Sequence, residues 1–239
     1  MEKNKLTRFI TKYALGSLVE SVKWQSANGT LKTSFISDDK SVLGSVEFKD
    51  FNQPDFTVGV YDTSKLTKLL NVLGDDIEIS TLSIEDKIYA FRVKDTSTKL
   101  DYMLADLQVI PAVPDLKQTP EFDIKINLDN NFVNKFIKAK AALNDEPSFT
   151  VVKTGSNVQV YIGYTQNSSA TNIAIDVDCD TELESFKPLS FSASYFKEIL
   201  NANRESKTAI LNISTQGLAH IQFESDDYVS DYYLVHTLS

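Results

Sequence analysis

The stretch Val58–Ser80 reads VGVYDTSKLTKLLNVLGDDIEIS, and it predicts a strand, a helix and a second strand within 23 residues. The first strand ends at Tyr61, and the polar run that follows it is typical of a helix N-terminus. Leucines then recur at helical spacing, at positions 66, 69, 70 and 73. Gly74 ends the helix, and a new strand begins at Ile77.

The same plan occurs a second time in Ser190–Ser214, which reads SFSASYFKEILNANRESKTAILNIS. Both stretches contain a small polar pair followed by an apolar-x-x-apolar-Leu-Asn sequence. Leu66, Leu69, Leu70 and Asn71 correspond in this way to Phe196, Ile199, Leu200 and Asn201. A repeated unit of this kind indicates a duplicated architecture.

Each half of the chain reads helix, strands, helix, strands. The predicted helices cover residues 3–15, 62–73, 130–143 and 193–204. The predicted strands cover residues 19–25, 30–36, 42–48, 56–60, 77–81, 87–93 and 96–104, then 122–128, 148–153, 157–164, 170–177, 186–191, 208–213, 218–224 and 228–235. Helices do not alternate one for one with strands. We therefore expect an α+β fold of two similar domains, each with an antiparallel sheet and two helices.

A proline-bearing segment separates the two halves. Residues 105–121 read ADLQVIPAVPDLKQTPE and hold three of the six prolines. Proline donates no hydrogen bond to a sheet, so this segment is predicted to be an extended connector. The predicted organisation is an N-terminal domain at 1–104, the connector at 105–121 and a C-terminal domain at 122–239.

The composition indicates how many domains the chain forms and in which compartment it acts. The 239 residues suit two domains. Cys179 is the single cysteine, which excludes an internal disulfide framework and fits a reducing cytoplasm. No apolar run is long enough to span a bilayer, and the basic N-terminus lacks the apolar core of a signal peptide. We expect a cytoplasmic protein without a membrane partner.

The net charge of −9 is unevenly distributed. The four predicted helices hold 11 basic and two acidic residues, whereas the rest of the chain holds 13 basic and 31 acidic residues. Lysine is a good helix former, but so is glutamate, and the helices nearly exclude it. The pattern predicts basic helix faces that meet a polyanion through its phosphates, without base-edge readout. No aromatic side chains are expected to interleave with these cations on the helix faces, which favours duplex over single-stranded nucleic acid.

No sequence motif supports an enzyme or a cofactor. Asp176, Asp178 and Asp180 imitate the start of a calcium loop, but Thr181 and Lys187 stand where the loop needs glycine and glutamate. The two histidines, His220 and His236, lack the spacing of a zinc site. There is no P-loop, G-x-S-x-G or G-x-G-x-x-G sequence. We expect no metal, no cofactor and no catalytic residue, and we set aside a hydrolase that uses surface carboxylates.

Three segments resemble the DNA polymerase sliding clamps. Val58–Ser80 is similar to a segment of the clamps of T-even-type bacteriophages. DYMLADLQVIP (Asp101–Pro111) and DYYLVH (Asp231–His236) resemble segments of the proliferating cell nuclear antigen clamps. The resemblance implies the DNA clamp fold, with two domains per chain and a homotrimeric ring. Helices would line the hole and sheets would face outward.

The resemblance also implies a function and its residues. A ring that encircles duplex DNA would tether the replicative DNA polymerase, and a separate clamp loader would open it. The cations expected to line the hole are Lys5, Arg8, Lys12, Lys65, Lys68, Lys135, Lys138, Lys197 and Arg204. The residues expected to form a pocket for a partner peptide are Val42, Leu43, Val109, Ile110, Pro111, Tyr233 and Val235. The strands expected to pair between subunits are residues 96–104 and 157–164.

An alternative remains at this point. The duplicated α+β chain could be a structural or interaction module that has the clamp fold but does not encircle DNA. Retention on circular but not on linear DNA separates the two functions.

Overall fold

The structure is a computed structural model that describes residues 1–116, 118–165, 170–206, 209–225 and 227–237. The chain divides into two compact units. Unit 1 contains Met1–Ser37, Gly44–Pro114 and Ser225–Ser230, and unit 2 contains Asp38–Leu43, Asp115–Glu224 and Asp231–Ser239. The division falls inside the predicted connector. Each unit also takes one short segment from the other half of the chain, which the sequence did not predict.

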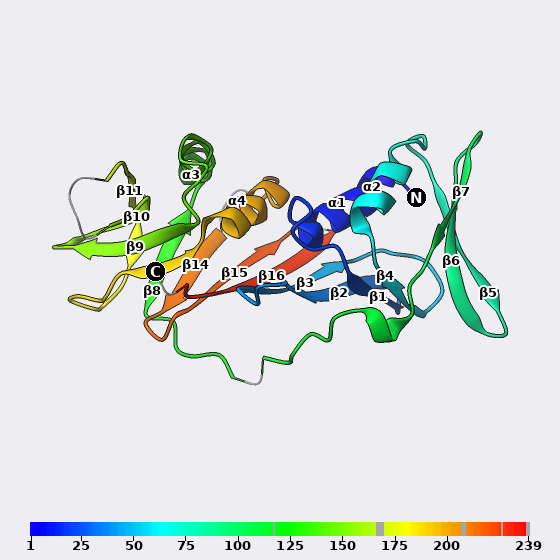
Figure 1. Ribbon diagram of the computed structural model, residues 1–239, viewed down its shortest axis with the longest axis horizontal. Coiled ribbons are helices and arrows are strands. Elements are labelled where there is room, and N and C mark those ends of the chain that lie inside the picture. The colour runs from blue at the N-terminus through cyan, green and yellow to red at the C-terminus, as the bar shows by residue number, and fades with distance from the viewer. Residues whose placement is uncertain (117, 166–169, 207–208, 226, 238–239) are drawn as a thin grey trace. The chain divides into compact units, whose positions relative to one another are not determined.

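Unit 1 holds two helices and two antiparallel sheets. Its elements are α1 (Lys3–Ala14), β1 (Val22–Ala27), β2 (Thr30–Ile36), most of β3 (Val42–Phe48), β4 (Phe56–Val60), α2 (Thr63–Leu70), β5 (Glu78–Ile84), β6 (Lys87–Lys94), β7 (Lys99–Met103) and the short 3-10 helix η1 (Leu107–Val109). One sheet has the order β4-β1-β2-β3 and the other the order β5-β6-β7. Helices α1 and α2 pack together on one side of the first sheet (Figure 1).

Unit 2 repeats this plan. Its elements are β8 (Ile124–Leu128), α3 (Asn130–Ala142), β9 (Ser148–Thr154), β10 (Asn157–Ile162), β11 (Ile173–Val177), β12 (Cys179–Asp180), β13 (Leu189–Ser192), α4 (Ala193–Ala202), β14 (Ala209–Ser214), β15 (Leu218–Glu224) and most of β16 (Tyr228–Val235). Its sheets have the orders β12-β8-β14-β15-β16 and β11-β10-β9-β13. Helices α3 and α4 pack together as α1 and α2 do. The predicted α+β class, with antiparallel sheets and paired helices, is confirmed.

Most element boundaries agree with the prediction within three residues. The strand predicted at 208–213 begins at Ala209, and its first predicted residue lies outside the described part of the chain. The two-residue strand β12 and the 3-10 helix η1 were not predicted, because neither carries a periodic apolar pattern.

The prediction of which strands form open edges is half wrong. The structure places β7 at the end of its sheet, as expected for residues 96–104. In unit 2, however, β10 lies between β9 and β11 and pairs with both, so residues 157–162 are internal. The two ends of that sheet are β11 and β13. Period-two alternation marks both strands alike, so the sequence could not tell an edge from an interior strand.

The duplicated stretch builds β4, α2 and β5 in unit 1 and β13, α4 and β14 in unit 2. Asp62 caps α2, because its Oδ1 accepts a hydrogen bond from the Lys65 backbone N–H at 2.7 Å. The Ser192 hydroxyl caps α4 by accepting from the Tyr195 N–H at 3.4 Å. The apolar faces of both helices are buried, with Leu66 and Phe196 as their first anchors. The two stretches are therefore equivalent in structure as well as in sequence.

Aromatic side chains fill both cores. In unit 1, Phe9 of α1 packs edge-on against Trp24 of β1, with ring centroids 5.5 Å apart. In unit 2, Phe196 of α4 contacts Phe136 of α3 and Phe149 of β9, with centroids 4.9 and 4.7 Å apart. Each unit therefore joins its helix pair to its sheets through one aromatic cluster.

A carboxylate fixes the turn that follows α2. Asp95 accepts hydrogen bonds from the backbone N–H groups of Gly74, Ser97 and Thr98, at 2.6, 2.7 and 2.6 Å. These donors lower the pKa of the Asp95 carboxyl from 3.8 to about 2. The interaction ties the end of the α2 segment to the hairpin between β6 and β7.

This carboxylate gives the protein an acid-sensitive contact. Because the folded-state pKa lies below the unfolded-state value, Asp95 contributes stability that is complete above about pH 5 and is lost as the pH falls through 2. We expect Asp95→Asn to unfold more easily at pH 7 and to lose less further stability between pH 5 and pH 2 than the unchanged protein. Urea unfolding at a series of pH values measures this difference. Parallel pH curves for the two proteins would contradict the assignment.

Candidate functional site

The cations of α1 differ in their access to solvent. Lys5 is about one-third exposed along its side chain (33%), and Arg8 is half-buried. Lys12 is buried, with 1% of its surface exposed, and its Nζ lies 5.2 Å from the centroid of the Tyr228 ring. A buried ammonium group cannot reach a phosphate at the surface. The prediction that Lys12 lines a DNA-facing surface is therefore wrong.

The other predicted cations are at the surface of the helices or just beyond them. Lys65 and Lys68 of α2 are exposed, as are Lys135 and Lys138 of α3. Lys197 of α4 is half-buried and its Nζ lies 3.3 Å from the Glu198 carboxylate. Arg204 follows α4 in a turn, is exposed, and donates from Nε to the Asn201 side-chain oxygen at 3.2 Å. Each unit thus presents basic side chains on its helix pair.

The residues predicted to form a peptide pocket fall in both units. Val109, Ile110 and Pro111 belong to unit 1, and Val42, Leu43, Tyr233 and Val235 belong to unit 2. In unit 2 the Val235 N–H donates to the Ser41 carbonyl at 2.8 Å, which places the end of β16 beside the start of β3. Tyr233 stacks on His220, with ring centroids 4.5 Å apart.

Burial contradicts the pocket prediction for two of these residues. Val42 has no exposed surface, and Ile110 is 5% exposed. Ile110 packs where Gly59 has no side chain, since a Cβ there would lie 3.0 Å from its Cγ1. Both residues therefore hold the fold together and do not line an open pocket. Leu43 and Tyr233 are half-buried, while Val109, Pro111 and Val235 are exposed.

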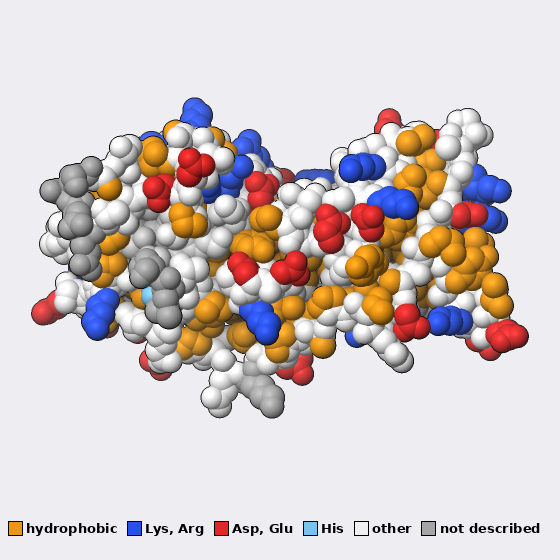
Figure 2. Space-filling view, in the orientation of Figure 1, with side chains coloured by type: hydrophobic (Ala, Val, Ile, Leu, Met, Phe, Trp, Pro, Cys, Tyr) orange, Lys and Arg blue, Asp and Glu red, His pale blue; other side chains and the backbone are white. Residues whose placement is uncertain are grey.

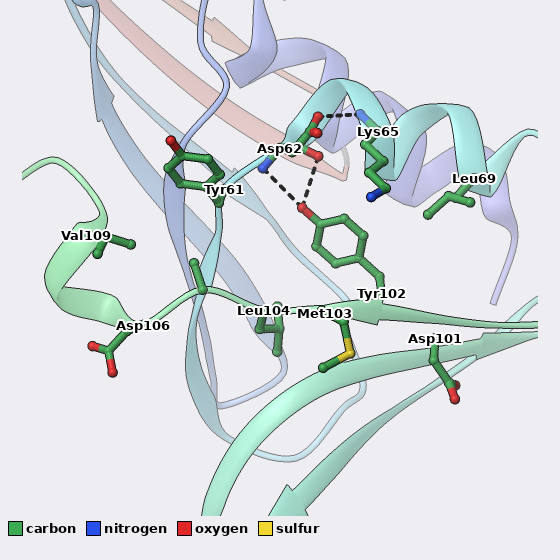
Figure 3. Close-up of a pocket in the computed structure, with 11 residues that line it drawn as sticks. Tyr61, Asp62, Lys65, Leu69, Asp101, Tyr102, Met103, Leu104, Asp106 and Val109 are labelled. Carbon is green, nitrogen blue, oxygen red and sulfur yellow. Dashed lines mark hydrogen bonds between the residues drawn. The ribbon is translucent and has the colours of Figure 1, made fainter.

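A surface pocket of about 650 Å³ lies in unit 1 beside the open strand β7 (Figure 3). Its walls come from the start of α2, from β7 and from the first part of the connector. The lining residues are Tyr61, Asp62, Lys65, Leu69, Asp101, Tyr102, Met103, Leu104, Ala105, Asp106 and Val109. Only Lys65 and Val109 of these were predicted as site residues.

Tyr102 holds the two walls of this pocket together. Its hydroxyl donates to the Asp62 carbonyl at 3.0 Å and accepts from the Asp62 N–H at 3.1 Å (Figure 3). Burial raises the pKa of the Tyr102 hydroxyl, so it remains protonated as a donor at neutral pH. Tyr102 therefore links β7 to the start of α2 at one wall of the pocket.

Several exposed apolar side chains line the pocket, together with four charged residues. Met103 is 63% exposed, and Tyr61 and Val109 are both 58% exposed. Figure 2 shows hydrophobic side chains gathered over the sheet of β5, β6 and β7. One sequence signal could have identified these exposed side chains. Met103 is apolar but occupies a position where the alternation of the strand predicts a polar residue.

The acids that imitated a calcium loop are engaged with neutral side chains. The Asp176 carboxylate accepts from the Gln159 amide at 2.8 Å, and the Asp178 carboxylate accepts from the Asn127 amide at 2.7 Å. Among the described residues, no group of His, Cys, Asp or Glu side chains is placed to hold a metal ion. Within the same residues, no helix is long and apolar enough to cross a membrane.

The architecture has counterparts among solved structures. The crystal structure of proliferating cellular nuclear antigen from Entamoeba histolytica superposes with a TM-score of 0.74 at 16% sequence identity, and the match covers 99% of this chain and 96% of that chain. Comparisons with protein-family models and with curated protein sequences find no match. At this identity the similarity shows the fold. The chain therefore has the fold of proliferating cell nuclear antigen, an α+β fold with antiparallel sheets and four α-helices among its described residues.

Proposed function

We propose that this chain is the subunit of a sliding clamp that encircles duplex DNA and tethers a DNA polymerase for processive synthesis. The observation that carries the proposal is the full-length fold match, combined with cations that stand on the helices of an otherwise acidic chain. The similarity of Val58–Ser80 to T-even-type phage clamps supports a phage clamp that acts in the cytoplasm of its host. The proposed DNA-facing cations are Lys5, Arg8, Lys65, Lys68, Lys135, Lys138, Lys197 and Arg204.

The contacts proposed with DNA are numerous and weak. Lysine and arginine side chains meet phosphates by charge, and they do so without reading bases. Such contacts allow the protein to slide, whereas one strong or base-specific contact would stop it. The acidic remainder of the surface, with 31 acidic residues outside the predicted helices, repels DNA from other faces.

Self-association as a homotrimer is proposed through two strands that each lie at an end of a sheet. Strand β7 ends one sheet of unit 1, and β11 ends one sheet of unit 2. Exposed Lys99 on β7 and exposed Asp176 on β11 have opposite charges. Because the two edges differ, pairing them between copies is head-to-tail, and such contacts form rings when the rotation closes. Three copies of a two-unit chain give six similar units around the hole.

Polymerase and clamp loader are proposed to dock a short apolar peptide. The surface residues available for this contact are Leu43, Val109, Pro111, Tyr233 and Val235. The chain itself is proposed to be a binding protein, with ATP-driven ring opening supplied by the loader.

A topological experiment tests the proposal. After loading by its clamp loader, the protein should stay bound to nicked circular DNA in high salt and should be released when the circle is cut. Sedimentation at micromolar concentration should give three times the 26.8 kDa chain mass. Equal release from circular and linear DNA would instead favour an interaction module that does not encircle DNA.

A further inference from the structure

The basic stripe of α1 is built against a segment from the far end of the chain. Lys5, Arg8 and Lys12 are spaced by three and four residues, so they share one face of the helix. The segment Ser225–Ser230 belongs to the same unit as α1. Two of its residues, Asp227 and Tyr228, make the contacts described below.

Tyr228 contacts Arg8 and Lys12 of the stripe. Its ring stacks on Phe48 of β3 at 5.2 Å, and its hydroxyl donates to the Lys5 carbonyl at 2.8 Å. The Arg8 guanidinium carbon lies 5.6 Å and the Lys12 Nζ lies 5.2 Å from the centroid of the same ring. These distances are those of cation–π contacts. Arg8 and Lys12 are therefore engaged with a buried ring.

Asp227 engages the remaining cation. Its Oδ2 lies 3.4 Å from the Lys5 Nζ, and the two side chains are similarly exposed, at 33% for Lys5 and 32% for Asp227. The Asp227 carbonyl also accepts from the Lys49 N–H at 2.8 Å, which fixes the backbone that carries the carboxylate. An ion pair this open to solvent contributes little to stability and can exchange partners.

We propose that the Asp227 carboxylate competes with DNA phosphate for Lys5 and so limits the grip of α1 on the duplex. This inference rests on the proposed function. Lys5 is the cation of the stripe that pairs with the Asp227 carboxylate, so Lys5 is the cation for which Asp227 and a phosphate compete. Asp227 is a positioning residue. Its carboxylate holds the Lys5 ammonium beside the path of the DNA, and the ion pair forms again when the phosphate leaves. A weakened grip of this kind suits sliding.

The experiment measures how duplex binding depends on salt. The logarithm of the binding constant falls with the logarithm of salt concentration by about 0.9 for each phosphate contact. For Asp227→Asn we expect tighter binding and a slope steeper by about 0.9 for each subunit that gains a contact. Fluorescence anisotropy on a short duplex between 50 and 300 mM salt gives this slope. The matched control is Glu78→Gln, which removes the same charge from an ion pair with Lys94 on the three-stranded sheet.

A double variant separates competition from a general charge effect. In a Lys5→Gln background, Asp227→Asn should leave the slope unchanged, because the contested cation is gone. A slope that steepens equally in both backgrounds, or equally in Glu78→Gln, would overturn the proposal. Should Asp227→Asn fail to fold by circular dichroism, Lys5→Gln alone decides. Lys5→Gln should reduce the salt-dependence slope less than Lys65→Gln does. An equal reduction of the slope by the two variants would overturn the proposal.

The two proposals fail in different ways. If the unchanged protein shows no salt-dependent duplex binding, the DNA function is wrong. If it binds and Asp227→Asn matches its slope, the DNA function stands and the competition is wrong.

Discussion

Reversing the charge of Lys65, Lys68, Lys135 and Lys138 to glutamate is expected to abolish duplex binding and processive synthesis while the fold is retained. All four side chains are exposed, and each unit contributes two of them. Each reversal removes a phosphate contact and adds a repulsive one, so non-specific binding should fall by roughly a thousandfold at moderate salt. Anisotropy on duplex DNA and primer extension with polymerase and loader measure the loss.

The control for this variant makes the same kind of reversal at three lysines of the sheets. Lys23, Lys32 and Lys125 are exposed on strands β1, β2 and β8. Their reversal to glutamate should reduce binding far less, since the sheets are proposed to face away from DNA. If strand reversals impair extension as severely as helix reversals, the assignment of the helices to the DNA face is wrong.

Replacing Gly59 by valine should detach the start of the connector from unit 1. A Cβ at this position would lie 2.8 Å from the Ala105 carbonyl oxygen and 3.0 Å from Ile110 Cγ1. The Ala105 N–H donates to the Gly59 carbonyl at 2.9 Å, so the backbones have no room to separate without losing that bond. Overpacking of this kind costs about 1–3 kcal/mol in unfolding free energy. Urea unfolding measures it.

Gly74→Ala is the matched control, because its new Cβ would meet only the Asp95 side chain, at 3.4 Å. We expect its unfolding free energy to change by less than about 0.5 kcal/mol. Gly59→Val should also weaken binding of a partner peptide, because Val109 and Pro111 lie next to the displaced Ile110. A Gly59→Val protein as stable as Gly74→Ala would show that the connector does not depend on this contact.

The sequence predicted the fold well because the repeated stretch combines several local signals. Asp62, the leucines of α2 and Gly74 each agree with the same strand–helix–strand plan, and the plan occurs twice. The assignment of Ser225–Ser230 to unit 1 could not be predicted from local signals. It depends on contacts between residues more than 170 positions apart, such as Phe48 with Tyr228, for which no local pattern exists.

The site was predicted less well for a related reason. Helical periodicity places Lys12 on the same face as Lys5 and Arg8, but only the tertiary structure brings Tyr228 over it. Val42 and Ile110 are apolar residues within the segments predicted to form the pocket. The sequence alone does not show whether such a residue is exposed for a partner or buried in the core, and both are buried. The pocket beside β7 was missed because residues from α2, β7 and the connector meet there.

The placement of Ser225–Ser230 in unit 1 has a consequence for how the protein is made. Unit 1 otherwise ends at Pro114, so 110 residues are synthesised between its last local segment and the six that complete it. At 5–20 residues per second this takes about 6–22 s. During that interval the Phe48 face that later receives Tyr228 is uncovered on the nascent chain. Unit 1 therefore reaches its complete set of contacts only after Ser225–Ser230 has been synthesised.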